Sequence, residues 1–254
     1  MDIAGEWALH LGVVILAMVA LPLLARSFLD VVGGESEPIR AIGSAAIVLG
    51  CLGMCGIVWA PALGGQGWIV YLIALIFLKF GLGLLVIFTW CVFRLGVPAA
   101  ALGVFVLLGI LTVSLVLDLH TARTDASYPE DSLGFRAGQL VTSLPFLWLG
   151  LESWRAHRLR RKGLALSVRA GFRESRLAAW AAACFAFSTE CLLAFAHSFV
   201  ADDTWRGLLI AGRGVVYGFS ALFVYHAFYV SAGLTSPEAR AARQPPTGPE
   251  TKLV

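Results

Sequence analysis

Long apolar stretches are the feature that most constrains this chain, because a helix of about 20 apolar residues crosses the hydrocarbon core of a bilayer. Seven such stretches follow one another along the 254 residues. The predicted spans cover residues 8–26, 41–60, 68–93, 98–118, 137–153, 177–200 and 207–232. The sequence therefore predicts an all-α integral membrane protein with a seven-transmembrane-helix bundle over residues 1–233. A Pro-rich tail, 234–254, is expected to be disordered.

The composition excludes a soluble enzyme. Apolar residues make up 59% of the chain and charged residues only 14%, whereas soluble domains carry about 25% charged residues. The chain has no Asn and three Gln, at Gln66, Gln139 and Gln244. Because carboxamides both donate and accept hydrogen bonds, their scarcity argues against a carrier for sugars or nucleosides.

The distribution of Lys and Arg predicts the orientation. Of the 19 basic residues, 14 fall on the side that holds the loops after the first, third and fifth spans together with the tail, and three fall on the other side. The positive-inside rule therefore places the C-terminus in the cytoplasm and the N-terminus outside. The segment 1–7 has no basic residue, so we expect the first span to stay rather than to be removed as a signal peptide. These features predict a multi-pass protein of a bacterial inner membrane.

The loop 154–176 holds most of the cytoplasmic basic residues. Its apolar positions alternate with Arg in a way that is typical of an interfacial amphipathic helix. We expect it to contact anionic lipid headgroups, or alternatively to dock a membrane protein partner or a second copy of the chain. The candidate membrane-surface residues are Arg155, Arg158, Arg160, Arg161, Lys162, Arg169 and Arg173.

Small residues predict where helices pack closely. Gly50, Gly53 and Gly56 line the second span, and Gly214 and Gly218 are one turn apart in the seventh. Such small-residue patterns let two helix backbones approach each other in a membrane.

Lys79 is the candidate site residue with the clearest physical argument. It lies about twelve residues into an apolar run of 26, far from either membrane surface. A charge at this depth usually faces the bundle interior and has a partner. If the third, sixth and seventh helices adjoin, then Lys79, Glu190 and Arg213 form one buried charged cluster. The hydroxyls of Ser188 and Thr189, next to Glu190 in the sequence, can bond helix carbonyls or the carboxylate itself.

Two cations and one anion would leave this cluster with a surplus positive charge. An anionic ligand, Asp118 or another outer carboxylate, or loss of the Lys79 proton would neutralise it. The structural alternative is a satisfied ion pair that fixes helix packing. A retinal-binding protein is not predicted, because its Lys belongs to the last of seven helices and this chain has Arg213 there.

The histidines near the outer surface are weak candidates for a metal site. His10, His120 and His197 come from separate segments and show no paired His motif, although two or three His with a carboxylate suffice for zinc. We therefore expect interfacial histidines, no metal and no cofactor. The chain also lacks phosphate-binding loops and nucleophile elbows, and nothing in it favours nucleic-acid binding.

Three functional hypotheses remain open. The first is a non-enzymatic sensor, receptor-like protein or accessory subunit that holds a small anionic or lipid-like ligand beside the buried cluster. The second is a small-solute or ion transporter that uses the same charges at mid-depth. The third is a metal-dependent or redox membrane enzyme that uses the outer histidines.

Overall fold

The computed structural model describes residues 7–19, 38–60, 63, 67–124, 133–162 and 174–226. Within these ranges the chain is helical and contains no strand. The helices are Trp7–Val19, α2 Pro38–Trp59, α3 Gly67–Thr89, the π-helical turn η2 Trp90–Arg94, α4 Pro98–Thr124, α5 Leu133–Arg161, α6 Glu174–His197 and α7 Asp203–Tyr225. The predicted tail 234–254, the last residues of the first and seventh predicted spans, and Arg169 and Arg173 lie outside the described residues.

The prediction of an all-helical, membrane-type chain is confirmed. In the described part of the chain, five helical segments are long and apolar enough to cross a membrane, at Ala41–Trp59, Gly67–Arg94, Pro98–Thr121, Leu177–His197 and Asp203–Tyr225. The helix Trp7–Val19 is apolar but shorter, and α5 carries several charged residues. The count of seven spans and the orientation of the termini stay predictions.

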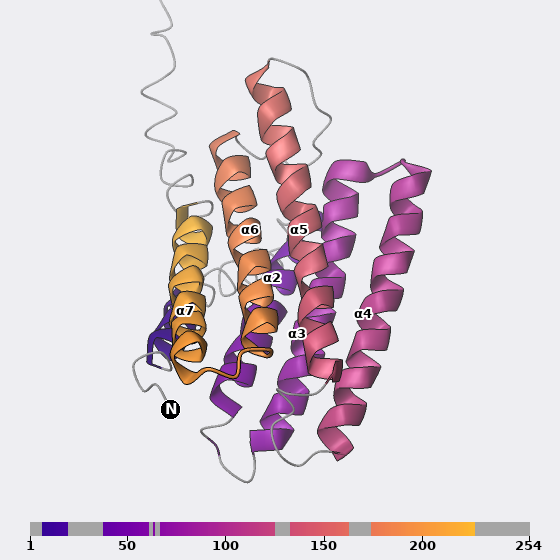
Figure 1. Cartoon of the computed structure of the whole chain (residues 1–254). Coiled ribbons are helices and arrows are strands. Elements are labelled where there is room, and N and C mark those ends of the chain that lie inside the picture. The colour runs from indigo at the N-terminus through magenta and orange to yellow at the C-terminus, as the bar shows by residue number, and fades with distance from the viewer. Residues whose placement is uncertain are drawn as a thin grey trace, which may run out of the picture.

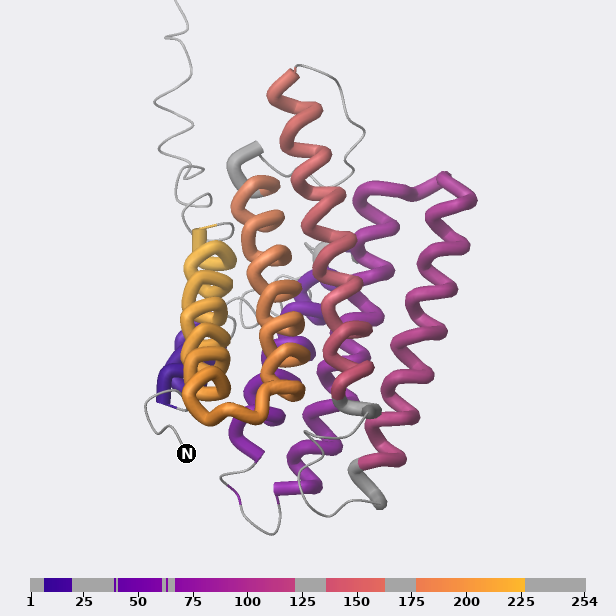
Figure 2. Tube along the Cα trace, viewed as in Figure 1, coloured from indigo at the N-terminus to yellow at the C-terminus, as the bar shows by residue number. Residues whose placement is uncertain are grey.

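The helices stand side by side in one bundle, with α7 and α4 at opposite edges (Figures 1 and 2). Helix α2 packs along α3, and α5, α6 and α7 pack in chain order. Helix α4 packs on α3 and α5, and α3 also contacts α5 directly. The bundle thus has two parts, one made of α2, α3 and α4 and the other of α5, α6 and α7. The contacts of α3 and α4 with α5 join the two parts, and buried polar residues meet at these contacts.

The connection between α3 and α4 is short. Helix α3 continues into the π-helical turn η2, and only three residues separate Arg94 from Pro98, which begins α4. Gly96 lies between them with a φ of +89°, a backbone conformation that side chains with a Cβ rarely adopt. Proline is favoured at the first position of a helix because its missing N–H has no helical partner there. This turn holds α3 and α4 as neighbouring antiparallel helices.

Some of the predicted small-residue contacts bring two backbones together. A Cβ added at Gly53 of α2 would lie 2.7 Å from the carbonyl oxygen of Ala74 in α3, and one at Gly214 of α7 would clash with the backbone of Ala8. In contrast, a Cβ at Gly50 or Gly218 would meet open space. The small-residue pattern predicts which helix faces pack. Only at some of its positions do two backbones come so close that a side chain would not fit.

The outer face of α4 is apolar and exposed. Its side chains include Phe105, which is 72% exposed, as well as Leu102 and Val113. In water such a surface would cause aggregation, whereas in a bilayer it is covered by lipid. The exposed apolar face therefore agrees with a membrane environment for the bundle.

Candidate functional site

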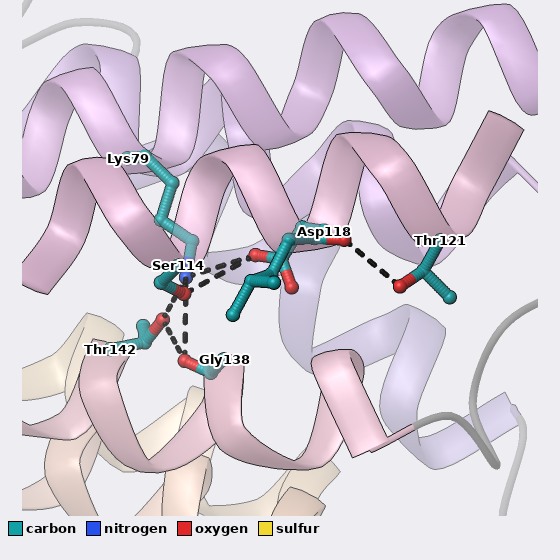
Figure 3. Close-up of polar contacts among 7 residues, drawn as sticks. Lys79, Ser114, Asp118, Thr121, Gly138 and Thr142 are labelled. Carbon is teal, nitrogen blue, oxygen red and sulfur yellow. Dashed lines mark hydrogen bonds and ion pairs between the residues drawn. The ribbon is translucent and has the colours of Figure 1, made fainter.

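The ammonium group of Lys79 is surrounded by oxygen atoms from two neighbouring helices. Lys79 in α3 is 5% exposed, and its Nζ lies 3.2 Å from Oδ2 of Asp118 in α4. The same Nζ donates to Oγ of Ser114 at 2.9 Å, to Oγ1 of Thr142 at 3.2 Å and to the carbonyl oxygen of Gly138 at 3.4 Å. Figure 3 shows these groups converging on the end of the lysine side chain. The buried charge therefore has an ionic partner and further acceptors.

The local sequence explains how each helix supplies these groups. Ser114 and Asp118 are four residues apart and so lie on one face of α4, where Oγ of Ser114 donates to Oδ2 of Asp118 at 3.5 Å. In α5, Thr142 donates to the carbonyl of Gly138, one turn earlier, at 2.7 Å. A Cβ at Gly138 would lie 2.9 Å from Oδ1 of Asp118. The absence of a side chain at this position lets the carboxylate reach the α5 backbone.

A second ion pair joins α6 and α7. The guanidinium of Arg213 donates from Nε to Oε1 of Glu190 at 2.9 Å, and Glu190 is 2% exposed. The buried phenol of Tyr217 interacts with the same carboxylate. Like Asp118, which is 6% exposed, the carboxylate of this second pair is therefore buried inside the bundle.

This arrangement differs from the predicted single cluster. Lys79 takes Asp118 as its partner, whereas Glu190 pairs with Arg213. Asp118, one of the groups considered for the surplus positive charge, is the one that neutralises it. Because both cations are already paired with carboxylates, the argument for an anionic ligand loses its basis.

The residues flanking Glu190 point in different directions. Ser188 is buried, whereas Thr189 is exposed and its hydroxyl donates to the carbonyl of Phe185 at 2.8 Å. Thr189 thus satisfies its own helix backbone, as hydroxyl residues often do within apolar helices. The helix carbonyl is one of the two partners expected for this hydroxyl.

The three histidines lie in different surroundings. The ring of His10 packs edge-on against Trp59, with centroids 4.9 Å apart. His120 is exposed and His197 is buried. Among the described residues, no group of three or more His, Cys, Asp or Glu side chains is placed to hold a metal ion.

The basic segment begins as part of a helix. Helix α5 continues to Arg161, so the first part of the predicted loop 154–176 forms its last turns. Arg155, Arg158 and Arg161 are exposed there, as is Lys162 just after the helix. The remaining described member of the predicted set, Arg160, is half-buried.

A third ion pair lies near this end of α5. Nη2 of Arg94 is 2.7 Å from Oε1 of Glu152, and Nε of Arg94 donates to the same oxygen at 2.8 Å. This pair connects the turn after α3 to α5.

An apolar cavity of about 40 Å³ lies between the two parts of the bundle. One water needs roughly 10–15 Å³ in the same measure, so the cavity has room for a few methylene-sized groups. Side chains and glycines from five labelled helices and the first helix enclose it. The lining residues are Leu16, Ala46, Ile47, Gly50, Cys51, Met54, Gly81, Leu82, Leu85, Phe146, Trp180, Cys184, Phe187 and Val224.

Asp118 ends the predicted fourth span, 98–118, and was therefore expected at the outer surface. Helix α4 instead continues to Thr124, and the side chain of Asp118 is buried in the bundle. The four-residue spacing of Ser114 and Asp118 was the available signal, since both face one side of a helix. No sequence pattern indicates that Gly138 and Thr142 accept hydrogen bonds from Lys79. These contacts depend on where α5 packs against α3.

No family model, no curated protein and no solved structure matches this chain.

Proposed function

We propose that this chain is a non-enzymatic, receptor-like or accessory membrane protein whose helical bundle holds the apolar end of a lipid-like molecule. The observation that supports this proposal is the apolar cavity between α2 and α3 on one side and α5, α6 and α7 on the other. Among the residues that the structure describes, its lining has no carboxylate, amine or guanidinium group. A site of this composition favours hydrocarbon over a polar solute.

The cavity begins about one helical turn from the buried ion pairs. Leu82 follows Lys79 by three residues in α3, and Phe187 precedes Glu190 by three residues in α6. A molecule with a hydrocarbon end in the cavity and a weakly polar group toward the ion pairs would match both environments. The small volume admits one chain end or a small ring, so the rest of such a molecule would lie between the helices and in the bilayer.

The experiment fills the cavity with a larger side chain. Cys51 lines the cavity and is buried, so Cys51→Leu should extend its side chain into the ligand space. Cys91→Leu is the matched control, because Cys91 lies in η2 and is not among the residues that line the cavity.

The readout is quenching of Trp180, which lines the cavity, by a brominated long-chain alcohol in lipid nanodiscs. Comparison with Trp180→Phe isolates this residue from the other tryptophans. We expect saturable quenching of Trp180 in the wild type and in Cys91→Leu, and its loss in Cys51→Leu. Equal quenching of Trp180 in both cysteine variants, or none in the wild type, would contradict the proposal.

We further propose seven spans in a bacterial-type inner membrane, with the N-terminus outside and the C-terminus in the cytoplasm. The five apolar helices and the excess of basic residues on one side support this topology. A membrane-impermeant maleimide added to intact cells should label Asp2→Cys, whereas Lys162→Cys should react only after the membrane is opened. The reverse labelling pattern would refute the orientation.

The exposed basic residues at the end of α5 would then lie at the cytoplasmic surface. We propose that Arg155, Arg158, Arg161 and Lys162 contact anionic lipid headgroups there, a position that also suits a protein partner. No observation on the described residues specifically favours transport or metal-dependent catalysis. The cavity is apolar and does not include Lys79, whereas a carrier would be expected to present polar groups to its solute.

A further inference from the structure

The surroundings of Lys79 have the composition of a cation site. Around Nζ lie one carboxylate oxygen, two hydroxyl oxygens and one carbonyl oxygen, at 2.9 to 3.4 Å. They come from Asp118 and Ser114 in α4 and from Thr142 and Gly138 in α5, while the ammonium itself comes from α3 (Figure 3). Apart from the lysine, these four residues supply the kind of ligands that hard cations take in proteins.

The size of the site and its charge indicate which class of cation fits. The four oxygens lie at hydrogen-bond and ion-pair distances from an ammonium nitrogen, so the space between them is that of an ammonium group. One carboxylate balances one positive charge, whereas Mg²⁺ and Ca²⁺ usually take more than one carboxylate and shorter distances. A monovalent cation about as large as an ammonium group meets both conditions.

We propose that this oxygen cage is a binding site for a monovalent cation such as K⁺, and that the Lys79 side chain is a tethered ion that occupies it. The tether explains how α3 is held to α4 and α5 at a buried position without a free ion. It predicts that the wild-type protein needs no particular salt, and that a free cation enters once the lysine side chain is removed. This inference is independent of the apolar cavity.

The test uses the full chain with Lys79→Ala, which vacates the cage and leaves Asp118 buried without its partner. Melting temperatures are measured in detergent at one ionic strength in KCl, NaCl or choline chloride. We expect KCl to raise the melting temperature of Lys79→Ala by about 3 °C over choline chloride, in a saturable manner. Na⁺ should act more weakly, because shorter ion–oxygen distances require the cage to contract. Choline is too large to enter.

The matched control is the double variant Lys79→Ala with Asp118→Asn, in which the cage has the same size but no charge. Its melting temperature should not distinguish the three salts, and neither should that of the wild type. The proposal is overturned if Lys79→Ala melts equally in all three salts. The proposal is also overturned if the double variant regains the melting temperature of the wild type while Lys79→Ala stays low in all three salts. In that case the cations do not replace the ammonium group. A saturable K⁺ effect on the wild type also overturns it, whatever the variants do.

Discussion

Asp118→Ala should lower the free energy of unfolding by about 3–5 kcal/mol, which is the range for removing one member of a buried ion pair. Lys79 is 5% exposed and lies in the middle of α3, so its side chain has no short route to water. The hydroxyls of Ser114 and Thr142 would remain as acceptors, but neither carries a charge. The cost comes from the ammonium that is left in an apolar bundle without its carboxylate.

The measurement is reversible unfolding of the purified protein in mixed detergent micelles. A double variant, Lys79→Met with Asp118→Leu, is the control, because well-packed apolar residues can replace a buried ion pair at little cost. We expect the double variant to recover most of the stability lost by Asp118→Ala. If Asp118→Ala unfolds like the wild type, then the ion pair between α3 and α4 does not stabilise the bundle.

Glu190→Ala should be the second most damaging change, with a loss of about 2–3 kcal/mol. Glu190 is 2% exposed, and its carboxylate accepts a hydrogen bond from the guanidinium of Arg213. The loss should be smaller than for Asp118→Ala, because the arginine side chain is 14% exposed and its long apolar stem lets the charged end shift toward a more polar place.

Thr189→Ala is the matched control for this prediction. Thr189 adjoins Glu190 in α6, but it is exposed and bonds only its own helix backbone among the contacts described above. Its replacement should change the free energy of unfolding by less than about 0.5 kcal/mol, as is usual for surface positions. Similar losses for Thr189→Ala and Glu190→Ala would show that the α6 backbone, and not the ion pair, is sensitive at this position.

The helices are largely predictable from the sequence, because hydropathy is a local property of each segment. The predicted span 177–200 corresponds to α6, Glu174–His197, and the predicted span 98–118 begins at the same Pro98 as α4. The ends are less predictable. Helix α5 runs to Arg161 because Arg and Lys are good helix formers, although hydropathy alone ends the span at residue 153.

The candidate site is predictable only in part. The depth of Lys79 in an apolar run indicates that it needs a partner, and the structure provides one. The identity of that partner depends on which helices adjoin. The predicted cluster required α3 to adjoin α6 and α7, whereas Lys79 meets α4 and α5. The pairing of Glu190 with Arg213 follows from the packing of α6 on α7, which are joined by a short connection.

The sequence by itself determined the environment and the class of structure, because burying about twenty apolar residues in lipid requires a helix whose backbone hydrogen bonds are all internal. It also determined that a charge at position 79 has to be paired. Only the tertiary structure decided that Asp118 is the partner, that Gly138 leaves room for its carboxylate, and that an apolar cavity lies beside the ion pairs. These features depend on the meeting of side chains from helices far apart in the chain. That meeting is set by the shapes of whole helix faces, which no local pattern of residues specifies.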